Sequence, residues 1–132
     1  PLPIGMLLME SGRPFSCDTI APGVKVWLST GGEGAFGRGR WQLLDAIQKR
    51  GSLQLAAEEL GISYRKAWGD LRKTEHILGV SLLERHRGGR GGGECSLTEE
   101  GRRWWKEYAR FEREVESYVA VSFARWVKRM TR

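Results

Sequence analysis

A group of basic side chains falls on one side of residues 64–78, a segment with helical periodicity. Its apolar positions form one stripe, namely Tyr64, Ala67, Trp68, Leu71 and Leu78. The basic positions point elsewhere: Arg65, Lys66, Arg72, Lys73 and His76. Arginine and lysine can bridge O6 and N7 of guanine, and either can instead bind phosphate. The pattern indicates nucleic-acid chemistry, although the simpler interpretation of any one of these charges is a solvated face.

A second basic segment follows at residues 82–97. Its centre, Arg87 to Gly93, has five glycines in seven residues, which excludes regular structure. We expect strands on either side, over Leu82–His86 and Glu94–Leu97. Such a loop can follow a phosphate backbone or enter a minor groove, and the alternative is a hairpin tip without function. The preceding helix favours the binding role.

Three helices must position these groups. Periodicity predicts them over 38–50, 53–60 and 64–78, with Ser52 and Ser63 as N-caps. The spacing of Ala57 and Gly61 is typical of a helix-turn-helix, because the small alanine permits close approach and the glycine accepts a left-handed turn. The alternative is an ordinary helical hairpin.

Gly69 lies inside the third helix, where glycine costs about 1 kcal/mol relative to alanine. Close approach to DNA or to another helix could compensate, and the sequence leaves both explanations open. The N-terminal turns of a recognition helix point into the major groove, so Arg65 and Lys66 are expected nearest the bases.

A long helix is predicted from the cap at Thr98 to about Met130. Its apolar residues step by four and three in a heptad-like seam, and its first turns are expected to pack on the chain's own domain. More than 30 residues span about 50 Å, which exceeds so small a body. We therefore expect the rest of the helix to meet another subunit. The residues predicted for dimerisation are Trp104, Tyr108, Phe111, Val115 and Tyr118.

The residues before the helices contain two short strand candidates. Residues 1–23 carry all four prolines and are expected to form an extended arm. Lys25–Leu28 and Gly34–Phe36 are strand candidates around a turn at Thr30–Gly32. The glycines of 32–37 match G-x-G-x-x-G, but a dinucleotide site needs a second parallel strand after the helix, and here another helix follows.

Composition agrees with one basic globular domain of 132 residues, 40% of them hydrophobic. The net charge is +6, and residues 1–37 hold two basic and three acidic residues, so residues 38–132 carry +7. A basic region of this kind favours a polyanionic partner. Cys17 and Cys95 fit neither a C-x-x-C pair nor a zinc site, and no apolar run approaches the ~18 residues of a membrane span. We expect reduced thiols, a cytoplasmic location and no membrane partner.

Several of these segments resemble a known family. G-R-W-Q-L-L-D-A-I, G-S-L-Q-L-A-A-E-E-L-G-I-S-Y-R-K-A-W and L-L-E-R-H-R-G-G-R-G-G-G-E-C-S-L-T-E-E-G-R-R are similar to the N-terminal domain of ModE-type molybdate-responsive transcription regulators. The resemblance covers about residues 24–118, and A-A-x-x-L with L-T-x-x-G is more distantly similar to LysR-type winged helices. It implies a dimeric winged helix that regulates molybdenum-related genes. It also implies that Ser63, Tyr64, Arg65 and Lys66 begin the recognition helix.

One departure from the family concerns the sensor. Full-length members carry C-terminal molybdate-binding domains after the long helix, whereas this sequence stops at Arg132. Molybdate sensing is therefore not carried over, and molybdate enters as a candidate ligand through the resemblance alone. Residues before Lys25 have no counterpart in the family.

The sequence thus predicts a mainly α fold with a small β component, a winged helix-turn-helix with a long C-terminal dimerisation helix. The expected parts are an arm at 1–23, the winged helix at 24–101 and the long helix at 102–132. The expected function is a homodimeric transcriptional regulator, lacking the usual oxyanion-binding domains, that binds a palindromic site in double-stranded DNA. The residues expected to bind DNA are Ser63, Tyr64, Arg65, Lys66, Gly69, Arg72, Lys73, Arg85, Arg87 and Arg90.

Two other classes of function remain as alternatives. The first is a protein-interaction module that docks a partner through the tryptophan-rich long helix. The second is a direct sensor that binds an oxyanion with wing amides or helix N-termini. An enzyme is the least supported class, since no nucleophile elbow or metal cluster stands out in the sequence.

Overall fold

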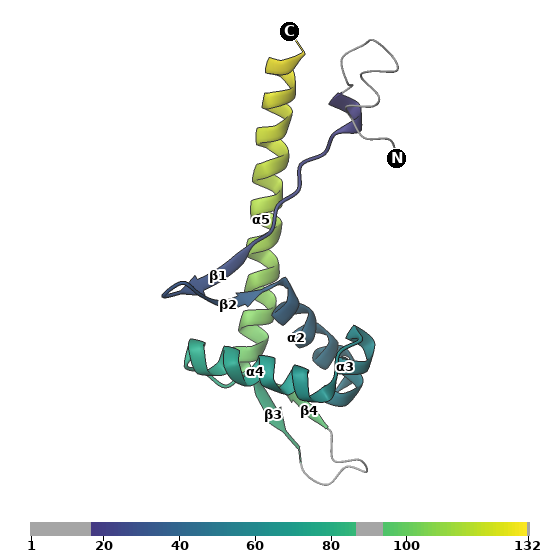
Figure 1. Cartoon of the computed structure of the whole chain (residues 1–132), viewed down its shortest axis with the longest axis vertical. Coiled ribbons are helices and arrows are strands. Elements are labelled where there is room, and N and C mark those ends of the chain that lie inside the picture. The colour runs from purple at the N-terminus through teal and green to yellow at the C-terminus, as the bar shows by residue number, and fades with distance from the viewer. Residues whose placement is uncertain (1–16, 87–93, 132) are drawn as a thin grey trace. The chain divides into compact units, whose positions relative to one another are not determined.

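The computed structural model describes residues 17–86 and 94–131 (Figure 1). Its contacts divide the chain into two units. One unit is Val26–Arg113, and the other joins Glu114–Arg132 with the residues up to Lys25. The predicted fold class is confirmed, because helices dominate and the β component is two short hairpins.

The N-terminal residues contribute one helical turn and one hairpin. A 3-10 turn, η1 (Cys17–Thr19), interrupts the arm that the sequence had suggested to be extended. Strands β1 (Trp27–Thr30) and β2 (Glu33–Gly37) pair antiparallel, with Thr30 opposite Glu33. The two glycines of the turn, Gly31 and Gly32, have positive φ, which suits a tight hairpin turn between twisted strands. The first strand begins two residues later than expected.

Three helices form the centre of the Val26–Arg113 unit. They are α2 (Arg38–Arg50), α3 (Leu53–Leu60) and α4 (Tyr64–Leu78), with the predicted boundaries. Each ends at a glycine in the left-handed region. Ser52 Oγ accepts a 3.2 Å hydrogen bond from the amide of Leu55, so the predicted cap of α3 is confirmed.

The wing strands follow α4. Strand β3 (Leu83–Arg85) pairs antiparallel with β4 (Cys95–Leu97), and each is shorter than expected. The amide of Cys95 donates a 3.0 Å hydrogen bond to the carbonyl of Gly51, which fastens the returning strand to the start of the helix-turn-helix.

The long helix α5 (Glu99–Met130) has the expected extent. Thr98 begins it, because its Oγ1 accepts a 2.9 Å hydrogen bond from the amide of Gly101. None of the helices described is long and apolar enough to cross a membrane.

The hydrophobic core joins all these parts of the Val26–Arg113 unit. Its fully covered side chains include Leu44 and Ile47 of α2, Leu71 of α4, and Leu82 and Leu97 beside the wing. Helix α2 packs against α3, α4 and β4, so the helix-turn-helix and the wing share one core.

Two tryptophans tie α2 to α5. Trp41 Nε1 donates a 2.8 Å hydrogen bond to the carbonyl of Trp105, and Trp105 Nε1 donates a 3.0 Å bond to Asp45 Oδ1. The indole rings contribute apolar area while their N–H groups stay satisfied. The first turns of α5 are therefore part of the domain, as predicted.

The predicted inward stripe of α4 needs one correction. Tyr64 is 43% exposed, because α4 enters the core one turn later, at Ala67. Thr74 is buried instead, and its Oγ1 accepts a 2.9 Å hydrogen bond from Arg40 Nε. A polar residue in this stripe is tolerated because Arg40 satisfies it.

Candidate nucleic-acid interface

The first turn of α4 is held by its cap. Ser63 Oγ accepts a 3.0 Å hydrogen bond from the amide of Lys66, and Gly61 in the left-handed region sets the turn between α3 and α4. A satisfied N-cap orders the first turn of a helix. Ser63, Tyr64, Arg65 and Lys66 are all exposed at this end of α4.

The outer face of α4 is exposed and basic. Arg65, Lys66, Arg72, Lys73 and His76 are all exposed, as is Gly69 between them. Helical geometry puts residues 65, 69, 72, 73 and 76 on the side opposite Ala67 and Leu71. The structure therefore brings together most of the α4 residues that the sequence had suggested for DNA.

Two lysines on this face already have ion-pair partners. Lys66 Nζ lies 3.0 Å from Asp70 Oδ2, and Asp70 also lies 3.4 Å from Arg40. Lys73 Nζ lies 3.8 Å from a carboxylate oxygen of Glu33. Exposed pairs of this kind contribute little energy and exchange readily for another anion.

Arg65 differs from these lysines. Within residues 17–86 and 94–131 no ion pair engages it. Its guanidinium can therefore bind a base edge or phosphate without first giving up a protein carboxylate.

Gly69 leaves open space on the outer face of α4. A Cβ built on Gly69 meets no described atom within 4 Å outside its own helical turn. Of the two explanations for this glycine, a neighbouring helix of this chain therefore receives no support. Close approach of an external partner remains.

The base of the wing touches α4 through an arginine–tryptophan contact. The guanidinium carbon of Arg85 lies 3.7 Å from the centre of the Trp68 ring, and that of Arg72 lies 5.8 Å from it. Both distances are within the range of cation–π attraction. Arg85 is exposed at the end of β3, so the contact carries a wing charge to the edge of α4.

Glu75 provides a second link between α4 and the wing. Its Oε2 accepts a 2.7 Å hydrogen bond from the amide of Leu82 and a 3.4 Å bond from that of Leu83. The sequence pattern did not indicate Glu75 as a support, and it placed Trp68 only in the core stripe. The available signal was spacing: residues 68, 72 and 75 share one side of a helix.

The tip of the wing carries two further predicted DNA contacts. Arg87 and Arg90 lie outside the described residues, so their assignment stays a prediction. At the base, Nε2 of His86, the residue after β3, lies 2.9 Å from Oγ of Ser96 in β4.

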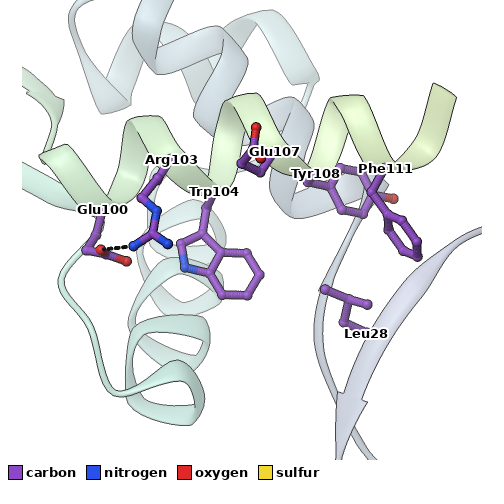
Figure 2. A pocket seen from close by; sticks show the side chains of 7 residues that line it. All are labelled: Leu28, Glu100, Arg103, Trp104, Glu107, Tyr108 and Phe111. Carbon is purple, nitrogen blue, oxygen red and sulfur yellow. Dashed lines mark hydrogen bonds and ion pairs between the residues drawn. The ribbon is translucent and has the colours of Figure 1, made fainter. Parts of the chain in front are cut away.

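A second surface lies on α5 and is apolar, unlike the basic face of α4. It is a groove of about 400 Å³. Figure 2 shows Trp104, Tyr108 and Phe111 of α5 facing the groove with Leu28 of β1 across from them. Charged groups at its rim are Glu100, Arg103 and Glu107.

The residues predicted for dimerisation divide by exposure. Tyr108 is 3% exposed, and its ring meets Phe36 edge-on at 5.1 Å, so its side chain is already covered. Trp104 is half-buried against Phe36. Phe111 and Tyr118 are exposed and Val115 is half-buried. Tyr108 therefore serves the domain's own core, and the assignment of the other four to dimerisation stays a prediction.

Cys95 lies in the core beneath the wing as a free, buried thiol. Burial raises the pKa of this thiol, against a smaller lowering by a backbone hydrogen bond at Leu53 and by the Arg85 charge. No group of His, Cys, Asp and Glu in the described part of the chain could hold a metal ion.

These features define a winged helix-turn-helix in which α4 has an exposed basic face. Residues 39–102 match the model of the bacterial regulatory helix-turn-helix proteins of the LysR family. The chain is 37% identical over 78 residues to the molybdenum transport protein ModE of Azotobacter vinelandii, and 39% identical over 74 residues to the transcriptional regulator ModE of Haemophilus influenzae. Those matches take in 59% and 56% of this chain but only 29% of each relative. The matched region is thus under a third of the relatives' length.

A solved structure agrees in fold. The crystal structure of a CbnR DBD–DNA complex has a TM-score of 0.52 to this chain at 24% identity, covering 65% of this chain and 93% of that one. The predicted resemblance is confirmed as a similarity: residues 39–102 match the LysR-type helix-turn-helix model, and the chain is similar to ModE-type regulators.

Proposed function

We propose that this chain is a transcriptional regulator that binds double-stranded DNA through α4 and the wing, and that it is not an enzyme. The observation that carries the proposal is the exposed basic face of α4, held by the Ser63 cap and centred on an open Gly69. A helix presented in this way has the size to enter a major groove. The family match over residues 39–102 supports the same role.

Within this proposal, the residues of α4 have different parts. Arg65 is the base-reading candidate, since it sits in the first turn of α4 and lacks a carboxylate partner among the described residues. Lys66 would exchange Asp70 for DNA. Tyr64 and Ser63 lie beside them, and Arg72, Lys73 and Arg85 are candidates for phosphate.

We further propose that the functional form is a homodimer joined through α5. Phe111 at 44% exposure and Tyr118 at 70% are large apolar side chains that a second copy would cover. A two-fold dimer presents two copies of α4 to successive major grooves about 34 Å apart, and its site would be palindromic. Glu99–Met130 is long enough for contacts beyond the domain.

The test replaces Arg65 and Lys66 separately by alanine and measures binding to duplex DNA. Loss of a base contact should cost about 1–3 kcal/mol and relax preference at one base-pair position. Arg103→Gln, an equal loss of charge on α5, is the matched control and should bind like the parent protein. If both α4 variants also bind like the parent, α4 is not the DNA face.

The apolar groove favours the second candidate, docking of a partner protein. Its lining is mostly Leu28, Trp104, Tyr108 and Phe111, and a groove of about 400 Å³ can receive an apolar side chain. Binding of a partner protein that is insensitive to salt, by a chain that has no affinity for DNA, would support this candidate over the regulator.

A further inference from the structure

Trp68 lies between α4 and the wing strand β3, and the proposed DNA role gives it no part. It is half-buried on α4, and the guanidinium carbon of Arg85 lies 3.7 Å from its ring centre. At that distance the guanidinium lies over the indole ring, well within the range of cation–π attraction. Among the ring contacts of cations described in the structure, this is the shortest.

The same ring is also close to a cation from its own helix. Arg72, four residues after Trp68, has its guanidinium carbon 5.8 Å from the ring centre. Two like charges would otherwise move apart, since each repels the other. The negative face of one indole provides attraction for both, and no carboxylate in the described ion pairs neutralises either arginine.

Backbone contacts keep the wing strand against α4 at this place. The carboxylate of Glu75 accepts hydrogen bonds from the amide of Leu82, just before β3, and from that of Leu83, its first residue. Arg85 is two residues beyond Leu83, so its side chain leaves a strand whose start is fixed to α4. A surface depression of about 390 Å³ adjoins the ring and is lined in part by Trp68, Arg72 and His76.

We propose that Trp68 is a positioning residue for DNA binding: its indole holds Arg85 beside Arg72, so that wing and recognition helix together receive one backbone phosphate. The inference rests on the proposed function. Arginine suits the task because its planar guanidinium stacks on an aromatic face while its N–H groups remain directed at an anion. The contact with Trp68 also restricts the long Arg85 side chain before DNA binds. Less conformational entropy is therefore lost on binding.

The experiment uses a labelled mixed-sequence duplex, since phosphate contacts do not depend on sequence. Affinity is measured for the full chain across a series of salt concentrations. Arg85→Gln should weaken binding about 5- to 10-fold near 0.1 M salt and reduce the salt slope by about one ion. Trp68→Leu should weaken binding about 2- to 5-fold, and Trp68→Phe should weaken it less.

The decisive result is the coupling between the two residues. Trp68→Leu should have little effect once Arg85 is already glutamine, whereas a merely structural tryptophan would weaken both backgrounds equally. Equal effects in both backgrounds overturn the positioning role while the proposed DNA function stands. A parent protein without salt-dependent binding to any duplex overturns the proposed function itself.

One variant keeps the test valid if Trp68→Leu does not fold. Arg85→Lys retains the charge but loses the planar stack and the forked donors, and should weaken binding about 2- to 5-fold. Binding equal to that of the parent protein would overturn the proposal. Arg103→Gln again serves as the control for charge.

Discussion

The hydroxyl of Tyr108 donates a 2.7 Å hydrogen bond to the backbone carbonyl of Val26, 82 residues earlier in the chain. The contact joins α5 to the residue just before β1. The Tyr108 ring also packs edge-to-face against Phe36 of β2. The start of the long helix is therefore part of the domain core.

Removing this hydrogen bond should lower the free energy of unfolding. Tyr108→Phe keeps the ring and should cost about 1 kcal/mol, because the Val26 carbonyl loses its donor. Tyr118→Phe, at a residue 70% exposed, is the matched control and should leave monomer stability unchanged. Urea unfolding of both variants measures the difference. Equal stability of Tyr108→Phe and the parent would mean that water replaces the bond.

Gly101 should tolerate no side chain. A Cβ at this position would lie 2.2 Å from the carbonyl oxygen of Leu82, a backbone atom that cannot rotate away. Gly101→Ala should therefore cost about 3 kcal/mol or more, at the upper end of overpacking effects. Thermal unfolding checks this, and an unchanged melting temperature would show that α5 does not begin so close to the wing.

Gly69 should behave in the opposite way. Gly69→Ala meets no clash within the chain and should raise the free energy of unfolding by about 1 kcal/mol, as expected for alanine in a helix. If α4 enters the major groove at this point, the added methyl should also weaken DNA binding. Stability and affinity are measured on the same preparation. Higher stability with unchanged affinity would remove Gly69 from the DNA face.

The buried thiol predicts a particular dependence on pH. Burial raises the pKa of Cys95 above its ordinary 9.0, so the folded state favours the protonated thiol. Its contribution to stability is complete below pH 9.0 and is lost as pH rises through the raised pKa. The difference in unfolding free energy between the parent and Cys95→Ala should therefore shrink as pH rises above 9.0.

Alkylation kinetics give an independent check on Cys95. In a Cys17→Ser background, iodoacetamide should modify Cys95 at pH 8 more slowly than it modifies free cysteine, because the thiolate is the reactive form. Equal rates would contradict the burial of this thiol. Denaturant should restore the rate of an ordinary cysteine.

The helix boundaries could be predicted from short stretches of sequence. Ser52, Ser63 and Thr98 are caps that depend on neighbouring residues alone, and Gly51, Gly61 and Gly79 end the helices by their own conformational freedom. The boundaries of α2, α3 and α4 were therefore predictable from the sequence.

Side-chain partners were less predictable, because they come from distant parts of the chain. The burial of Thr74 depends on Arg40, which is 34 residues away. The stacking of Arg85 on Trp68 depends on where β3 meets α4. Helical periodicity assigned Tyr64 to the core because it cannot show that the helix reaches the core only at Ala67.

Titration of the chain with duplex DNA from its own upstream region, at two salt concentrations, tests the central claim most directly. We expect binding that favours one palindromic site over mixed-sequence DNA and that weakens as salt rises, since basic residues contact phosphates. Weak binding that is equal for every duplex would contradict a sequence-specific regulator and would favour a partner-docking domain.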